Sequence, residues 1–142
     1  YDYSIFKEIK GNFLIPLEVI YRNALPEGSS LLKRLNKKEV TLEELNLNKM
    51  PKPNDRFDPP IIELSTKLEI TDRYISWKEA LEMVPFKEEE IQKLRCIVLD
   101  INKLITEEFS KINLFNEDGK IELGFTPDRE FIVIDVIGTL DE

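Results

Sequence analysis

A strand, a sharp turn and a short helix follow one another in residues 13–35, and this order constrains the fold of the chain more than any other stretch. β-Branched and aromatic residues are frequent in Phe13–Asn23, which predicts a strand. Side chains in a strand alternate between its two faces. The predicted faces are Leu17, Val19 and Tyr21 on one side and Glu18, Ile20 and Arg22 on the other. Two charged groups, Glu18 and Arg22, are therefore expected on the same side of this strand.

The turn after this strand contains Pro26 and Gly28, residue types that end a strand. Ser29 or Ser30 stands where the N-cap of a helix belongs, and the sequence leaves both choices open. A short helix should follow, and its buried side would consist of Leu31, Leu32 and Leu35.

The start of this helix has the features of an anion site. Backbone N–H groups are free at a helix start, and the helix dipole favours negative charge there. Arg22, Lys33 and Arg34 are near enough in sequence to add positive charge. The alternative interpretation is a simple cap followed by a solvated Lys-Arg pair, which involves no ligand.

The composition narrows the chemistry that this chain could perform. Its 142 residues include no histidine and one cysteine, which excludes an internal disulfide, a zinc site and a catalytic Ser-His or Cys-His pair. Lys, Arg, Asp, Glu or a carboxylate-bound hard metal would have to carry any chemistry. The net charge of −8 argues against nucleic acid or an anionic membrane as a partner. No signal peptide or membrane-spanning run is visible, so we expect a cytoplasmic location.

Capping patterns and turn residues predict several further elements. Residues 1–12 should form an entering strand that turns tightly into the strand at Phe13. Thr41–Glu44 and Ser76–Glu79 each have the form of a capping box, so a short helix is predicted at each. Pro60–Lys67 reads as a strand after a proline-rich loop.

A long amphipathic helix is predicted from about Lys87 to Ile112, because apolar residues recur there at three- and four-residue steps. Its apolar stripe is explained by packing against a core. The strands that begin at Phe13, Pro60, Lys120 and Phe131 would form an antiparallel sheet backed by this helix. The predicted fold class is therefore α+β, an antiparallel sheet with packed helices.

An acidic residue interrupts an apolar strand near the end of the chain. Lys120–Phe125 and Phe131–Ile137 are predicted as two strands joined by a Pro-Asp turn. The second strand is apolar on both faces, which is typical of a strand buried on both faces. An unpaired carboxylate is costly in such a strand, so Asp135 should have a partner.

The partner depends on the register of this hairpin. If Phe125 pairs with Ile132, Glu122 lies directly opposite Asp135. Two like charges so placed repel each other unless a divalent metal or Lys120 lies between them. The alternative is a register that differs by one residue, with Asp135 paired to an arginine or lysine elsewhere.

The sequence resembles the SAICAR synthetases, the phosphoribosylaminoimidazole-succinocarboxamide synthases, and archaeal members especially. Pro16–Asn23 (PLEVIYRN) and Gly28–Leu35 (GSSLLKRL) are similar to that family's PLEVVVRN and GSLxKRL. Pro60–Lys67 is similar to PLVEFxxK, and Lys120–Gly124 to KLEFG. Val133–Glu142 lies where the family has VLADEISPD, with Val in place of the second acid of its pair and Gly-Thr-Leu in place of the Ser-Pro step.

This resemblance implies an organisation for the chain. The family has an ATP-grasp-like fold, so residues 13–142 would form its second subdomain, which binds substrate and metal. Residues 1–12 would connect the two lobes, and the N-terminal ATP lobe would be absent from this chain.

The resemblance also implies roles for individual residues. Substrate-binding roles fall on Arg22, Ser29 or Ser30, Arg34, Lys67 and Asp141. The backbone near the adenine of ATP would belong to Lys7, Glu8, Ile9 and Lys10. Mg²⁺ would be held by Glu122 and Asp135, and Lys120 would act in catalysis.

The implied activity is that of an ATP-dependent carbon-nitrogen ligase of purine biosynthesis. It would join L-aspartate to carboxyaminoimidazole ribonucleotide (CAIR) through an acyl phosphate and give SAICAR, ADP and phosphate. The resemblance implies ATP and Mg²⁺ as cofactors, small-molecule substrates and a homo-oligomer in the intact protein, and this chain alone should be inactive. The alternative is a non-catalytic module that binds a phosphoribosyl group or a nucleotide.

Overall fold

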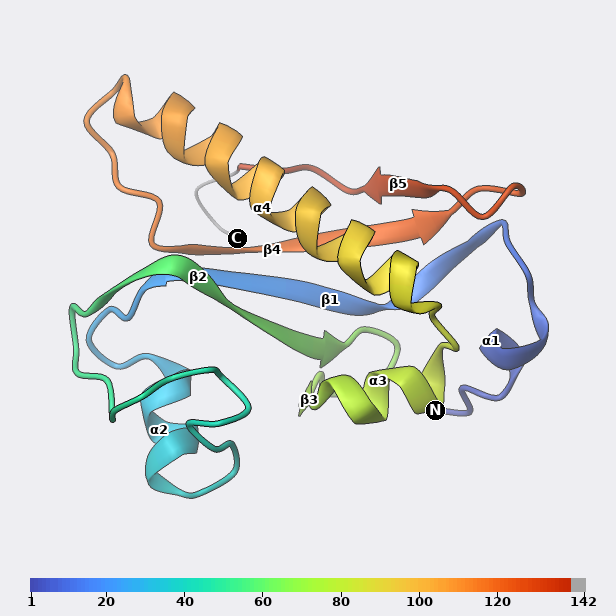
Figure 1. Cartoon of the computed structure of the whole chain (residues 1–142), viewed down its shortest axis with the longest axis horizontal. Helices are drawn as coiled ribbons and strands as arrows, with labels where there is room; N and C mark the ends of the chain where they lie inside the picture. The colour runs from blue at the N-terminus through green and yellow to red at the C-terminus, as the bar shows by residue number, and fades with distance from the viewer. Residues whose placement is uncertain (139–142) are drawn as a thin grey trace.

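The computed structural model describes residues 1–138 as a five-stranded sheet with helices packed around it (Figure 1). In chain order the elements are α1 (Ile5–Glu8), β1 (Phe13–Ala24), α2 (Ser30–Asn36), β2 (Arg56–Thr66), β3 (Tyr74–Ile75), α3 (Trp77–Met83), α4 (Glu88–Ser110), β4 (Asp118–Phe125) and β5 (Phe131–Ile134). Asp141 lies outside the described residues.

The strands lie in the order β3-β2-β1-β4-β5, and every neighbouring pair is antiparallel. The strand predicted from Phe13 is therefore the centre of the sheet, and the predicted α+β architecture is confirmed. Glu18 of β1 lies opposite Ser65 of β2 and Glu122 of β4. Because facing residues share a side of the sheet, this register brings polar side chains from three strands together.

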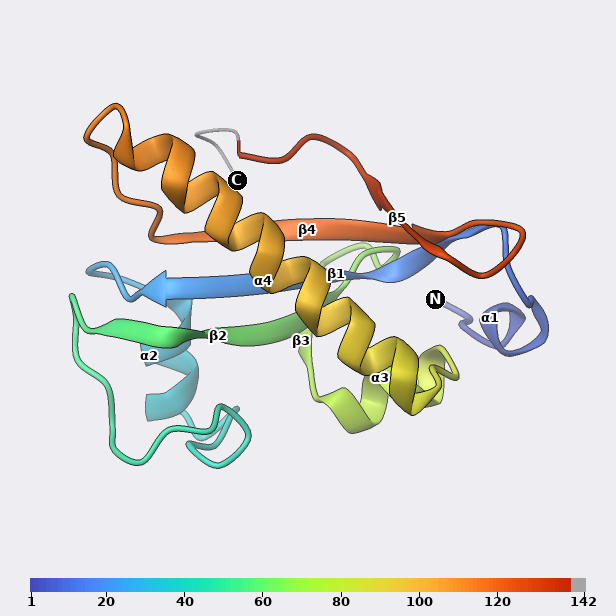
Figure 2. The ribbon, with the colours of Figure 1, turned by 45° about the horizontal axis from the view of Figure 1, so that its top comes forward.

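α4 crosses one face of the sheet (Figures 1 and 2). Leu94, Val98 and Ile105 are buried on its inner side and belong to the same apolar cluster as Val19 and Ile121. The predicted long helix is confirmed, with its ends at Glu88 and Ser110. Within residues 1–138, neither this helix nor a shorter one combines the length and apolar character of a membrane span.

A second apolar cluster holds α2 and the segment 37–55 beside the sheet, and it consists of Leu25, Leu31, Leu35, Leu45 and Ile61. The helix predicted at Thr41 is wrong, although the capping box is present: the Glu44 N–H donates to the Thr41 hydroxyl at 3.2 Å. Asn46 has a φ of 54°, and the Leu47 N–H donates to the Leu42 carbonyl at 2.8 Å. A left-handed residue closes the turn and prevents a helix from continuing.

The entering strand predicted for residues 1–12 is also wrong, because α1 forms a single helical turn there. Phe6 is buried in this turn, and its ring centroid lies 5.7 Å from that of Phe13. β1 already pairs with β2 on one edge and with β4 on the other, so no free edge of β1 remains for an N-terminal strand.

The β4–β5 hairpin has the alternative register, shifted by one residue from the register in which Phe125 would pair with Ile132. Phe125 pairs with Phe131, and Glu122 therefore lies opposite Ile134, not Asp135. The connection is one residue shorter than the Phe125–Ile132 pairing requires, and the Thr126 N–H closes it by donating to the Glu130 carbonyl at 2.8 Å. Asp135 follows the end of β5, is exposed and has a φ of 71°. The expectation that it interrupts a strand buried on both faces is wrong as well.

Candidate functional site

The face of the sheet opposite α4 collects acids and bases in equal number. We call this set the charged face, and it consists of Glu18, Glu63, Asp118 and Glu122 with Arg22, Arg34, Lys67 and Lys120. Arg22 is 5% exposed and Glu122 is 6% exposed, a degree of burial that charged residues rarely reach without a partner. The formal charges of the set cancel, so pairing within it offsets the cost of burial.

Arg22 lies near the end of β1 and uses each of its three nitrogens. Its Nε donates to Glu63 Oε2 at 2.8 Å, one terminal nitrogen donates to Asp118 at 2.6 Å, and the other donates to the Tyr74 hydroxyl at 2.9 Å. Burial alone would lower the pKa of Arg22, but the Glu63 carboxylate outweighs it and raises that pKa. A guanidinium has five N–H donors, so two remain available to a ligand.

Glu63 joins Arg22 to α2. Its second oxygen accepts a hydrogen bond from Arg34 at 2.5 Å, so one buried carboxylate serves two guanidinium groups. The Arg34 guanidinium carbon lies 3.5 Å from the centroid of the Tyr74 ring, a close cation–π contact. These contacts fix the helix start relative to the sheet.

Two further ion pairs lie on the same face of the sheet. Lys120 Nζ donates to Glu18 at 2.8 Å, and the Ser65 hydroxyl donates to the other Glu18 oxygen at 3.0 Å. The hydrogen bond that Lys120 donates to Glu18 raises the pKa of Lys120, which therefore remains an ammonium at neutral pH. Lys67 pairs with Glu122.

A polar cavity of about 400 Å³ opens above the charged face, between β1, β4 and the start of α2. Ser29 is the N-cap of α2 and accepts a hydrogen bond from the Leu31 N–H at 3.3 Å. The hydroxyl of the next residue, Ser30, lies 3.3 Å from the Tyr74 hydroxyl. Arg22 and Lys120 line the same cavity.

Most of the predicted substrate-binding residues thus come together. Ser29, Ser30, Arg22 and Lys120 share the cavity, and Arg34 and Lys67 belong to the charged face that surrounds it. Lys7, Glu8, Ile9 and Lys10 do not join them, because they precede the start of β1, whereas Arg22 lies near its end.

The two predicted metal ligands, Glu122 and Asp135, differ in burial. Glu122 is buried beside Lys67, and Asp135 is exposed and accepts a hydrogen bond from the Val136 N–H at 2.8 Å. Within residues 1–138, no three acidic, histidine or cysteine side chains are grouped so as to hold a metal by themselves. Mg²⁺ commonly uses one or two carboxylates and completes its shell with phosphate oxygens and water, so Glu122 fits such a role if Lys67 moves aside.

Sequence reasoning missed three members of this site. Glu63 could have been found, because it alternates with Ile62 and Leu64 and so falls on the polar side of its strand. Asp118 lies opposite Arg22 in β4, but it was missed because it precedes the Lys120–Gly124 motif from which that strand was predicted. Tyr74 lies in the two-residue strand β3, for which neither periodicity nor a motif gives a signal.

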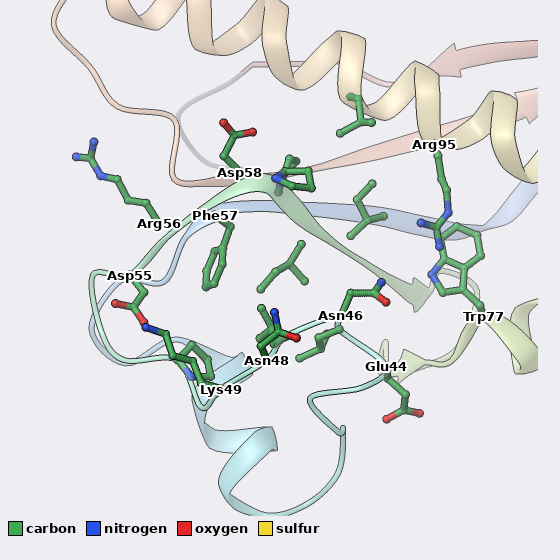
Figure 3. A pocket seen from close by; sticks show the side chains of 18 residues that line it. Glu44, Asn46, Asn48, Lys49, Asp55, Arg56, Phe57, Asp58, Trp77 and Arg95 are labelled. Atoms are coloured by element: carbon green, nitrogen blue, oxygen red, sulfur yellow. The ribbon is translucent and has the colours of Figure 1, made fainter.

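A larger cavity lies elsewhere in the described part of the chain. Figure 3 shows this hollow of about 830 Å³, bounded by β2, the loop before it, and α4. Arg95 stacks over Trp77 at one side, with the guanidinium carbon 4.6 Å from the ring centroid. None of the predicted site residues within the described part of the chain lines it, and its walls are mostly apolar side chains and amides. Size alone therefore does not identify the site.

Comparisons with known proteins agree with the geometry. A family model described as SAICAR synthetase matches residues 7–142. A protein of Archaeoglobus fulgidus, provisionally assigned as a phosphoribosylaminoimidazole-succinocarboxamide synthase, is 49% identical over 99% of this chain and 42% of its own length. The enzyme of that name from Thermoplasma acidophilum is 35% identical over 92% of this chain and 44% of its own length.

A solved structure extends the comparison to the fold. SAICAR synthase from Saccharomyces cerevisiae, solved in complex with SAICAR, aligns with a TM-score of 0.69 and 28% identity over 93% of this chain and 41% of that one. The chain thus spans less than half the length of these relatives. From the matched residues, the sequence identity and the shared fold, we conclude that this chain belongs to the SAICAR synthetase family.

Proposed function

We propose that this chain is the substrate- and metal-binding subdomain of an ATP-dependent ligase that joins L-aspartate to CAIR and releases SAICAR, ADP and phosphate. Family membership and the complex of the yeast relative with SAICAR support this proposal. The proposal includes ATP and Mg²⁺ as cofactors, an acyl phosphate intermediate, and a homo-oligomeric, cytoplasmic protein. Residues 1–12 would connect this subdomain to a lobe that covers ATP.

The observation that carries the proposal is the convergence of Arg22, Ser30 and Lys120 on one polar cavity. Arg22 and Ser30 would bind the phosphate group of CAIR, since both line this cavity and the three hydrogen bonds of Arg22 leave two of its N–H donors unused. Ser29 is committed to capping α2, so its contribution would be to hold the turn in place. Arg34 would act with Arg22 through the Glu63 carboxylate that they share.

Lys120 and Lys67 would offset the negative charge that builds up when phosphate is transferred to the CAIR carboxylate. Each pairs with a buried glutamate, and the raised pKa of Lys120 keeps that side chain an ammonium at neutral pH. Mg²⁺ would neutralise the ATP phosphates, with Glu122 and Asp135 as its proposed protein ligands. Asp141 remains a proposed substrate contact, and Lys7, Glu8, Ile9 and Lys10 the proposed segment beside adenine.

The test is ADP release by the full-length gene product, measured with CAIR, L-aspartate and Mg²⁺ and then with each omitted in turn. ADP should form only when all three are present. Lys120→Met should lower kcat by about 100-fold, because it removes a charge that stabilises the transition state. ADP release without CAIR or aspartate would contradict the ligase proposal and favour a non-catalytic or unrelated nucleotide-binding module.

Arg22→Lys tests the phosphate contact without removing the positive charge. Lysine lacks the planar donor fork, so the KM for CAIR should rise about 10-fold or more. Arg73→Lys is the matched control, because Arg73 pairs with Glu69 and Glu79 outside the cavity. An unchanged KM in Arg22→Lys would mean that Arg22 serves only the ion pairs of the charged face.

A further inference from the structure

Tyr74 occupies a position at the cavity that the chain's recognised motifs do not mark. It lies in β3 at the edge of the sheet and is half-buried. Its hydroxyl oxygen is 2.9 Å from a terminal nitrogen of Arg22 and 3.3 Å from the Ser30 hydroxyl. It thus touches both residues to which the proposed function assigns the substrate phosphate.

The direction of these hydrogen bonds leaves the Tyr74 hydroxyl with a hydrogen to donate. A guanidinium can only donate, so the Tyr74 oxygen accepts from Arg22 and keeps its own hydrogen for another acceptor. The only other partner among residues 1–138 is Ser30, at a distance near the long end for two hydroxyl groups. An anionic oxygen in the cavity would offer a shorter and stronger hydrogen bond.

The Tyr74 ring is held in place before any ligand arrives. Arg34 stacks on its face, with the guanidinium carbon 3.5 Å from the ring centroid. Glu63 in turn fixes Arg34 through a hydrogen bond of 2.5 Å. A donor that is already oriented loses little conformational entropy when it binds a ligand.

Charge balance makes such directed donors important at this site. The four bases of the charged face are matched by four acids, and Asp72 adds a further acid to the cavity lining, so the site offers an anion no excess of positive charge. Selection of a phosphate group must then come from hydrogen-bond donors that point into the cavity. Arg22, Ser30 and Tyr74 are donors of this kind from three different elements, β1, α2 and β3.

We propose that Tyr74 is a substrate-binding residue whose hydroxyl donates a hydrogen bond to the phosphate group of a phosphorylated ribonucleotide, beside Arg22 and Ser30. This inference rests on the proposed function for the nature of the substrate, and it adds a residue that sets the preference for a phosphorylated ligand over its dephosphorylated form.

The experiment combines one side-chain change with one ligand change. Tyr74→Phe removes a single oxygen and keeps the ring on which Arg34 stacks. Kd values for CAIR, for the dephosphorylated ribonucleoside and for inorganic phosphate are measured by calorimetry on the full-length gene product. Tyr3→Phe is the matched control, because the Tyr3 hydroxyl donates to Glu69 at 3.0 Å and does not line the cavity.

Tyr74→Phe should weaken binding of CAIR and of inorganic phosphate by about 10-fold or more, the usual effect of losing a hydrogen bond to a charged group. Binding of the dephosphorylated ribonucleoside should stay the same, and Tyr3→Phe should change none of the three Kd values. Equal weakening of CAIR and the ribonucleoside, or no weakening of either, would overturn the inference.

The two proposals can fail separately. If the unchanged protein does not bind CAIR, the proposed function fails, and inorganic phosphate still tests Tyr74. If the unchanged protein binds CAIR and phosphate but Tyr74→Phe binds both equally well, the role of Tyr74 fails while the proposed function stands.

Discussion

The two faces of the central sheet are both buried, but by opposite means. Under α4, Val19 and Leu123 are each 1% exposed and belong to the main apolar core. On the other side, Glu18 and Arg22 are 7% and 5% exposed and are covered by side chains of opposite charge. One face gains stability from removing apolar surface from water, whereas the other must balance every charge that it buries.

This difference explains why the proposed site lies on one face of the sheet. Apolar packing has no donors or acceptors to offer a ligand, and its side chains already fill the space. The charged face keeps unused donors on Arg22, and it borders a cavity. In the function that we propose, its residues serve folding and binding together, and substitutions there should affect both properties. Four substitutions sharpen this comparison.

Glu63→Gln should have the largest effect on stability. Two buried guanidinium groups, those of Arg22 and Arg34, would lose their common counter-ion, and the free energy of unfolding should fall by about 4 kcal/mol. Urea unfolding measures this loss. Glu39→Gln is the control, because its pair with Lys37 is exposed and worth about 0–1 kcal/mol. Equal losses of unfolding free energy in the two variants would contradict the view that the buried charges of the charged face depend on one another.

Leu94→Ala should be the matching change on the apolar face. Leu94 is 1% exposed, and the cavity left by its side chain should cost about 3 kcal/mol of unfolding free energy. Under conditions in which the variant is still folded, however, it should bind CAIR with an unchanged Kd. A large rise in Kd would show that the two faces are not separable in function.

Asn102→Ala should have an intermediate effect, because it removes the centre of a polar network under α4. Asn102 exchanges hydrogen bonds of 2.7 and 2.8 Å with Asn23 and accepts one of 2.9 Å from Asn116. Partners left unsatisfied should lower the free energy of unfolding by about 2 kcal/mol. The exposed neighbour Lys103→Ala is the control in the same urea titration, and a loss of similar size there would argue against a role for the network.

Lys120→Met should have the smallest effect on stability, and its size should depend on pH. The folded state raises the pKa of Lys120 above its usual 10.5 through Glu18, so this pair contributes fully below pH 10.5. The contribution is lost as the pH rises through the folded-state pKa. The difference in stability between the unchanged protein and Lys120→Met should therefore be constant near neutral pH and shrink above pH 10.5. A difference in stability that stays constant above pH 10.5 would contradict a stabilising ion pair between Lys120 and Glu18.

Local patterns were enough to predict much of this molecule. Alternation in β1 separated Val19 from Glu18, and helical periodicity placed α4, because each pattern reports which side of an element is buried. The choice between Ser29 and Ser30 as N-cap was left open, since either hydroxyl suits a helix start. The structure assigns the cap to Ser29.

The remaining features depend on contacts between distant segments. The hairpin register follows from the length of the turn between β4 and β5. Arg129 in this turn has a φ of 63°, a conformation that cannot be predicted from an arginine in the sequence. Tyr74 reaches the cavity only because β3 returns beside β2. Asp135 was assigned to a buried strand because its neighbours are apolar, yet β5 is an edge strand with Ile132 and Val133 exposed.

The most direct test of the central claim is a crystal structure of the full-length gene product with CAIR bound. Our account predicts that the phosphate group lies in the polar cavity, within hydrogen-bond distance of Arg22 and Ser30. If the phosphate instead lies in the larger hollow beside Trp77 and Arg95, or away from both, the charged face is a stabilising network and not the binding site.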